Sequence, residues 1–191
     1  MKATGPGQPL HLLLDIAEVL NEMRIPYAVI GALAVSFHGI PRATNDADAL
    51  VWLKPMDKTE TDLVQRLTQK GYRIESRSSD DQDPVAGVVS VEDRHRNRVD
   101  LLLGIRGMDP DAADRAASGT FLNSTLRFIS LEDLIAMKVF AGGHRDLEDV
   151  KGILQVSREH LNAALLRRLA TRYGADVSTK IEEMLEHIPG A

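Results

Sequence analysis

The hydrophobic pattern changes along the first two thirds of the chain, from helical spacing to short β-prone runs. From Pro9 to Met23 apolar residues return every three or four positions, which is the spacing of one helix face. Shorter β-prone runs come after it and predict strands, with Gly and Pro marking the turns between them. We expect strands at residues 27–30, 47–53, 72–75, 85–91, 98–103 and 127–129, and helices at residues 32–38, 59–70 and 109–117.

The last third of the chain has helical patterns only. We expect helices at residues 131–140, 145–156, 159–172 and 175–187. Ser130, with Asp133 three positions later, has the spacing of a capping box for the first of them. Strands first and helices last indicate an α/β (α+β) fold, in which a sheet domain precedes a helical region. The expected domains are a core at residues 1–130, which includes the N-terminal helix, and a C-terminal helical region at residues 131–191 packed on that core.

Composition places the chain among ordinary globular proteins. Hydrophobic residues make up 43% and charged residues 27% of the sequence, so a folded core is expected. The absence of cysteine excludes disulfides and thiolate metal sites. A net charge of -5 gives no general attraction to nucleic acid. The sequence has no signal-peptide pattern and no apolar run of ~20 residues, so we expect a cytoplasmic protein without membrane contact.

Two aspartates stand at the start of the predicted strand at residues 47–53. Asp46 and Asp48 are two positions apart, and alternate residues of a strand point to the same face. The intervening positions, beginning with Ala47, are apolar and predict that the other face is buried. Two parallel carboxylates repel each other, and a hard divalent cation such as Mg²⁺ or Mn²⁺ makes both favourable. Taken alone, so short a pattern is more often two solvated acids at a strand start.

A third aspartate lies inside another apolar run. Asp100 follows Arg98 and Val99 and precedes three leucines, where a carboxylate is costly unless it is paired or bound to metal. Arg98, on the same face, is one candidate partner. A metal site shared with Asp46 and Asp48 is the other, and it requires the two strands to be neighbours.

The order of these features resembles the nucleotidyltransferase superfamily, which has the DNA-polymerase-β-like fold. In that superfamily a strand is followed by a Gly-Gly or Gly-Ser pair, a short helix, a D-x-D pattern on the next strand and a third carboxylate on a later strand. Here the pair is Gly31-Ala32, the D-x-D acids are Asp46 and Asp48, and the third acid is Asp100. The resemblance implies a mixed β-sheet flanked by helices.

One branch of the superfamily is especially similar. The run at residues 38–44, with its His-Gly pair, arginine and threonine, resembles the bacterial minimal nucleotidyltransferases that include the AbiEii-type toxins. The runs at residues 131–138 and 145–149 are similar to the same branch. The resemblance covers roughly residues 25–155.

The resemblance implies a metal-dependent enzyme that moves a nucleoside monophosphate from a nucleoside triphosphate to a hydroxyl group and releases pyrophosphate. Asp46, Asp48 and Asp100 would be catalytic and would hold Mg²⁺ or Mn²⁺. Gly31 and Ala32 would position phosphates, which agrees with the close ligand approach that a glycine before a helix allows. RNA, protein and small molecules all stay open as acceptors. The branch further implies a toxin of a toxin-antitoxin or abortive-infection system, with an antitoxin protein as partner.

Charged residues farther along the chain are candidates for binding the nucleotide. Lys138 falls in the middle of the apolar face of its helix, so it either reaches the phosphates or extends past the helix end. Arg42, in the loop before the acids, either binds the triphosphate or is an exposed loop residue. Asp146 either orients Lys138 or Arg42, or accepts a hydrogen bond from a substrate, or is a helix-start charge favoured by the dipole. Asp149 is expected on the outer side of its helix.

Ala32 keeps other functions open. A serine at this position can contact a phosphate through its hydroxyl, whereas Ala32 offers only its backbone N–H. The first alternative is therefore a catalytically inactive nucleotidyltransferase fold that serves as a binding or regulatory module. A further alternative is an antibiotic nucleotidyltransferase of the aminoglycoside type.

Overall fold

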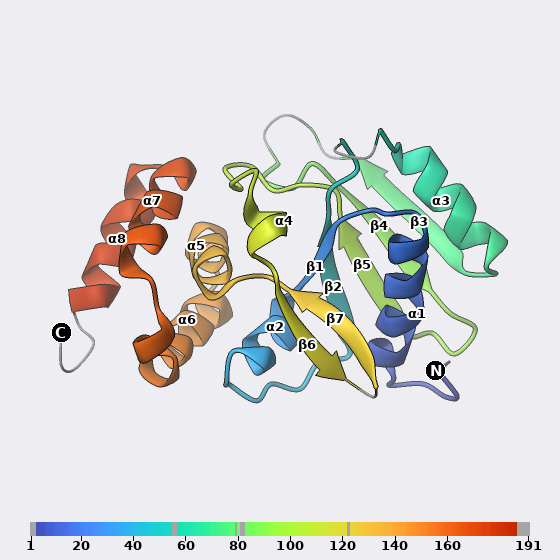
Figure 1. The fold of residues 1–191 in the computed structure, drawn as a ribbon, viewed down its shortest axis with the longest axis horizontal. Helices are drawn as coiled ribbons and strands as arrows, with labels where there is room; N and C mark the ends of the chain where they lie inside the picture. Colours follow the sequence, from blue (N-terminus) through green and yellow to red (C-terminus); the bar gives the residue numbers. More distant parts are fainter. Residues whose placement is uncertain (1–2, 55–56, 79, 81–82, 122, 187–191) are drawn as a thin grey trace.

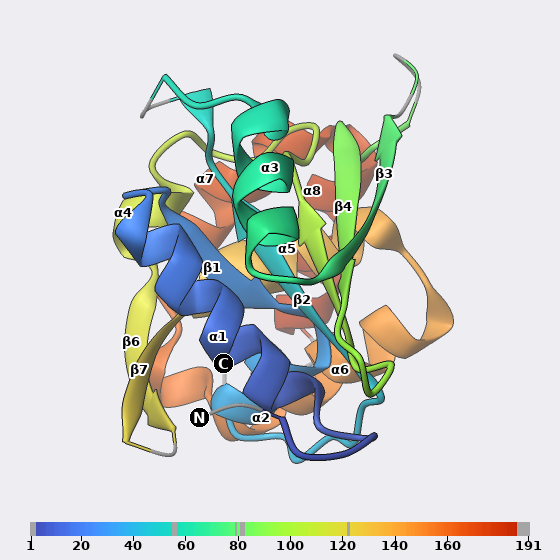
Figure 2. The ribbon, with the colours of Figure 1, turned by 90° about the vertical axis from the view of Figure 1, so that its right-hand side faces the viewer.

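A mixed seven-stranded sheet lies between two sets of helices (Figures 1 and 2). The computed structural model describes residues 3–54, 57–78, 80, 83–121 and 123–186. The strands are β1 Tyr27–Ile30, β2 Asp46–Val51, β3 Arg73–Ser78, β4 Gly87–Glu92, β5 Arg98–Leu102, β6 Ala117–Phe121 and β7 Ser124–Phe128. The helices are α1 Pro9–Glu22, α2 Gly31–Phe37, α3 Glu60–Gln69, α4 Ala112–Arg115, α5 Leu131–Ala141, α6 His144–Val156, the 3-10 turn η2 Arg158–His160, α7 Ala163–Tyr173 and α8 Ala175–Glu186.

The strand order in the sheet is β3-β4-β5-β2-β1-β7-β6. β2 is parallel to β5 and β1 is parallel to β7, while the other neighbouring pairs are antiparallel. The chain leaves β2, crosses to the edge of the sheet through α3 and β3, and returns through β4 to place β5 beside β2. The predicted α/β fold, with a mixed sheet flanked by helices and helices at the C-terminal end, is confirmed.

Each face of the sheet has its own helical layer. α1 and α3 lie on one face, and α5 and α6 lie on the other with α7 and α8 beyond them (Figures 1 and 2). Ala47, Ala49 and Val51 alternate along β2 and are buried, and α1 packs against this strand and β5. The residues between them point to the opposite face because side chains alternate along a strand. Asp46 and Asp48 therefore lie on the face that α5 covers.

The elements follow the predicted order, with departures near residues 112 and 160. The helix predicted at residues 109–117 is wrong in its extent, since α4 spans only Ala112–Arg115. Residues from Ala117 onward instead form β6, an edge strand that pairs with β7. Its Ala-Ser-Gly-Thr-Phe sequence lacks the run of β-branched residues that normally marks a strand. The helix predicted at residues 159–172 divides into η2 and α7, and residue 187 of the last predicted helix lies outside the described residues.

A buried ionic network joins the sheet region to the C-terminal helices. Asp109 is only 3% exposed and accepts hydrogen bonds from Arg115 Nη1 at 3.0 Å and Arg168 Nη1 at 3.1 Å. Arg172 adds a longer ion pair at 3.7 Å. Arg115 also donates to both oxygens of Asp133, at 2.9 Å each, at the start of α5. Side chains from α4, α5 and α7 thus share one charge-paired cluster.

Of the two hydrogen bonds of the predicted capping box, the structure shows the side-chain cap: Asp133 N donates to Ser130 Oγ at 3.2 Å. The division at residue 130 coincides with this cap but stays a prediction. Within the described part of the chain, no helix is long and apolar enough to cross a membrane.

Candidate active site

Asp48 and Asp100 lie directly opposite each other on neighbouring strands. β2 and β5 are parallel, and their register pairs Asp48 with Asp100 and Asp46 with Arg98. Register partners on paired strands point to the same side of the sheet, and Asp46 shares that side because it is two positions from Asp48. The structure therefore brings the three predicted acids to one face, next to the C-terminal end of β1, where Ile30 is the register partner of Asp48.

Gly31 lies against the Asp48 side chain at the start of α2. Its backbone has φ +64°, and a Cβ built there would stand 2.3 Å from Asp48 Oδ2. Only a glycine fits both the left-handed conformation and this close approach. Ala32 follows as the second residue of α2 and is partly exposed. The predicted Gly31-Ala32 pair is therefore adjacent to the acids.

The surroundings of Asp48 disfavour its charged form. Burial, followed by the charges of Asp46 and Asp100, raises the pKa of Asp48 to about 6. Lys138 and Arg98 act in the opposite direction and lower that pKa. A carboxylate that is costly to ionise among like charges is stabilised by a bound cation. The electrostatics of Asp48 thus fit a site for positive charge.

Asp46 and Asp100 have protein partners of their own. Thr44 Oγ1 donates to Asp46 Oδ1 at 2.8 Å, and Arg98 Nε donates to Asp100 Oδ1 at 2.9 Å. The salt-bridge interpretation of Asp100 is therefore correct for this structure. As the side chains stand, no group of three His, Cys, Asp or Glu residues among those described is arranged to hold a metal ion. Three carboxylates without nitrogen or sulfur donors suit Mg²⁺ or Mn²⁺ in chemistry, and the ion pair of Asp100 with Arg98 engages its Oδ1 atom.

Lys138 is buried between two carboxylates of α6. Its Nζ atom lies 2.7 Å from Asp146 Oδ1 and 2.7 Å from Asp149 Oδ2, and the residue is 5% exposed. The side chain therefore does not extend past the helix end into solvent. Its positive charge lowers the pKa of Asp48, so it acts across the space between α5 and β2. Asp146 contacts Lys138, as one of its interpretations predicted, and it also lies in the first turn of α6, as the helix-start interpretation predicted.

Arg42 is paired with Asp149 through its Nη1 atom. The Arg42 backbone is also fixed, because its N–H donates to Ser36 Oγ at 3.0 Å. The prediction that Asp149 lies on the outer side of its helix is wrong: it is buried and faces Lys138 and Arg42. Asp149 follows Asp146 by three positions, so the two share a helix face. This spacing, with a lysine that needed a partner, was the signal that could have identified it.

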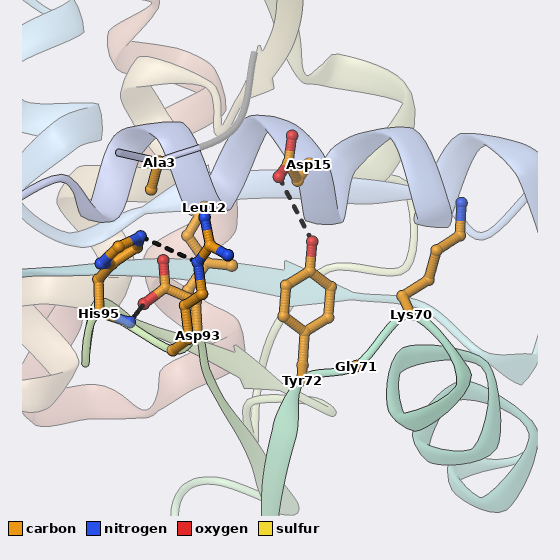
Figure 3. Close-up of a pocket in the computed structure, with 9 residues that line it drawn as sticks. Ala3, Leu12, Asp15, Lys70, Gly71, Tyr72, Asp93 and His95 are labelled. Atoms are coloured by element: carbon orange, nitrogen blue, oxygen red, sulfur yellow. Dashed lines mark hydrogen bonds between the residues drawn. The ribbon is translucent and has the colours of Figure 1, made fainter. Parts of the chain in front are cut away.

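A hollow of about 300 Å³ lies elsewhere, beside α1 (Figure 3). Asp15 on α1, Tyr72 after α3 and His95 in the β4–β5 turn are among its lining residues, and Tyr72 Oη donates to Asp15 Oδ2 at 3.4 Å. None of the predicted site residues lines it. Since it lies by the helix that covers the other face of the sheet, it is separate from the acids.

Comparison with solved structures shows the nucleotidyltransferase fold. An antigenic nucleotidyltransferase-like protein from Paracoccidioides brasiliensis is 17% identical, with a TM-score of 0.54 over 97% of this chain and 96% of that chain. The antibiotic-resistance factor ANT(2'')-Ia is 16% identical, with a TM-score of 0.57 over 92% of this chain and 94% of that chain. The sequence matches none of the curated proteins with which it was compared.

Family comparison adds a direct assignment. Residues 10–188 match the model of a family described as "Nucleotidyl transferase of unknown function (DUF2204)". The match spans nearly the whole chain and includes all three strand acids, Gly31 and the α5–α6 cluster. The AbiEii-like branch is not tested by this match and stays a prediction. The chain belongs to the DUF2204 family of nucleotidyl transferases.

Proposed function

We propose that this chain is a metal-dependent nucleotidyltransferase that uses Asp46, Asp48 and Asp100 to transfer a nucleoside monophosphate from a triphosphate to a hydroxyl group. The observation that carries the proposal is the register of β2 and β5, which sets Asp48 beside Asp100. Mg²⁺ or Mn²⁺, when bound, would polarise the α-phosphate and lower the pKa of the attacking hydroxyl. Family membership supports nucleotidyl transfer in general.

The charges around the site favour binding of a divalent cation. Five carboxylates face three cationic side chains. When every carboxylate is ionised, two negative charges remain in excess, and one divalent cation would neutralise them. The carboxylates are Asp46, Asp48, Asp100, Asp146 and Asp149, and the cations are Arg42, Arg98 and Lys138. The raised pKa of Asp48, which is caused first by burial and then by the charges of Asp46 and Asp100, also favours a bound cation.

Each residue has a distinct part in the proposed reaction. Gly31 leaves room beside Asp48, and the adjoining backbone N–H groups would meet the triphosphate. Arg42 and Lys138 would compensate phosphate charge, with Asp146 and Asp149 holding them. Asp100 would accept the proton of the acceptor hydroxyl, and its partner Arg98 is exposed.

The direct test is transfer of label from α-labelled nucleoside triphosphates in the presence of Mg²⁺. Total RNA, the protein itself and the aminoglycoside tobramycin serve as acceptors, the last because one solved structure of ANT(2'')-Ia is a complex with adenylyl-2''-tobramycin. Transfer to a component of a bacterial extract would extend the test to the toxin role that the AbiEii-like branch implies.

Asp46→Asn and Asp48→Asn should each reduce transfer to background, whereas Glu148→Gln, an exposed charge on α6 outside the site, should not. Label transfer that persists in both aspartate variants would contradict the proposed mechanism. Tight magnesium-dependent triphosphate binding without turnover would instead support the inactive binding module that Ala32 suggests.

A further inference from the structure

Asp149 of α6 forms an ion pair with Arg42, which lies in the loop between α2 and β2. Its Oδ2 atom pairs with both Arg42 Nη1 and Lys138 Nζ, and its side chain is only 10% exposed. Lys138 has Asp146 as a second carboxylate partner. For Arg42, Asp149 is the one ion-pair partner among the described residues. The position of the Arg42 guanidinium therefore depends on Asp149 more than that of the Lys138 ammonium does.

The backbone on both sides of this pair is tightly packed. Gly152 of α6 faces Ile40, and a Cβ at Gly152 would stand 3.3 Å from the Ile40 side chain. Gly39 likewise leaves room for Val156, and Ser157 Oγ donates to the His38 carbonyl at 2.8 Å. The loop that carries Arg42 thus lies along α6 for about two turns, and Asp149 meets Arg42 within a packed contact.

Much of the Arg42 guanidinium stays available to a ligand. A guanidinium has five N–H donors, and the described residues show a side-chain hydrogen bond from Arg42 to Asp149 alone. The Arg42 side chain is 28% exposed, in contrast to the buried Lys138. An arginine anchored at one nitrogen and open at the others loses little conformational entropy when it binds a phosphate.

We propose that Asp149 is a positioning residue for triphosphate binding, which acts by holding the Arg42 guanidinium in place for the phosphates. This inference rests on the proposed function of the same site. It assigns Asp149 no contact with the nucleotide, so its contribution to affinity passes through Arg42.

A double-mutant cycle tests this dependence. Calorimetry with Mg²⁺ and the α,β-methylene analogues of the four common ribonucleoside triphosphates gives Kd for wild type, Asp149→Asn, Arg42→Ala and the double variant, using the analogue that wild type binds most tightly. Asp149→Asn should weaken binding about tenfold, and the double variant should bind no more weakly than Arg42→Ala alone. Glu148→Gln removes a neighbouring exposed charge of α6 and should leave Kd unchanged.

The outcomes separate this inference from the function on which it rests. If the losses of affinity in Asp149→Asn and Arg42→Ala multiplied in the double variant, the two residues would act independently, and the positioning role would be overturned. An unchanged Kd in Asp149→Asn would overturn it as well. A loss of thermal stability in Asp149→Asn with no coupling to Arg42 would show a structural role only and would also overturn it. Failure of wild type to bind any of the four analogues would overturn the proposed function itself, and the positioning role with it.

Discussion

Gly31 approaches Asp48 so closely that a Cβ atom on Gly31 would stand 2.3 Å from Asp48 Oδ2. Real Cβ atoms do not tolerate such a contact, so any other residue at position 31 has to displace the carboxylate. The conformation at Gly31, with φ +64°, adds a second requirement for glycine. The start of α2 and the acid on β2 are therefore constrained as a unit.

Gly31→Ala should abolish nucleotidyl transfer and lower stability by more than the conformational strain alone. A matched control exists in Gly71, which has φ +90° but no atom within 4 Å of an added Cβ. Gly71→Ala should cost only the strain of about 1–2 kcal/mol for a left-handed alanine and should leave transfer intact. Thermal unfolding and label transfer measure the two effects. Equal stability losses in both variants, with activity retained at position 31, would contradict the close contact.

The raised pKa of Asp48 predicts how stability depends on pH in the absence of metal. Between the ordinary value of 3.8 and about 6, the folded protein binds more protons at Asp48 than the unfolded chain does, so this residue makes stability fall as pH rises. Asp48→Asn should therefore match wild type near pH 4 and exceed it by about 2–3 kcal/mol at pH 7. Denaturant unfolding in EDTA measures the difference. A variant that is less stable than wild type at pH 7 would contradict the predicted shift.

Metal binding should stabilise the protein through the same acids. At pH 7.5, millimolar Mg²⁺ should raise the unfolding temperature of wild type, and EDTA should reverse the change, because a ligand that binds only the folded state adds about 1–3 kcal/mol at 10- to 100-fold over its Kd. Asp46→Asn, Asp48→Asn and Asp100→Asn should each lose this response. Glu182→Gln, on the exposed surface of α8, provides the comparison. Differential scanning fluorimetry is sufficient, and an equal response in all variants would place the ion elsewhere.

Arg115 should be critical for stability. Arg115→Met leaves Asp133, which is 1% exposed, without its arginine, and removes one partner from the buried Asp109. Breaking a buried ion pair by removing one member costs about 3–5 kcal/mol. Arg167→Met removes an arginine of similar geometry, but its pair with Glu182 is exposed, so no measurable change is expected. Urea unfolding compares the two variants, and similar stabilities would contradict the importance of burial.

The sequence predicted the strand acids better than it predicted their partners. Alternation along β2 and the apolar run around Asp100 singled out the three acids as candidates, but these patterns alone did not join them into one site. The local sequence does not show that β2 and β5 are neighbours, because 46 residues, which include α3 and the β3–β4 hairpin, intervene between Val51 at the end of β2 and Arg98 at the start of β5. The resemblance to a known fold supplied that step.

Asp149 and β6 were missed for different physical reasons. The helical pattern of α6 was aligned on its leucines and valine, which placed Asp149 in solvent, while α5 presents a buried lysine to that side of α6. An ionic contact between helices leaves no hydrophobic signal. β6 was missed because the small residues of this edge strand have little strand propensity. Gly119, one of them, packs directly against the rings of Phe37 and Phe128, where a Cβ atom would not fit.

The buried Asp109 cluster has a practical consequence for engineering the chain. Two of the three arginines around Asp109 come from α7, more than fifty residues later in the sequence. In a shortened protein that stops after α6, only Arg115 of these three arginines would remain beside Asp109, and α5 would lose its packing against α7 and α8 at the same time. Deletion of α7 and α8 is therefore expected to destabilise α5, which carries Lys138. These two helices should thus be needed for nucleotide binding although they lie outside the proposed site.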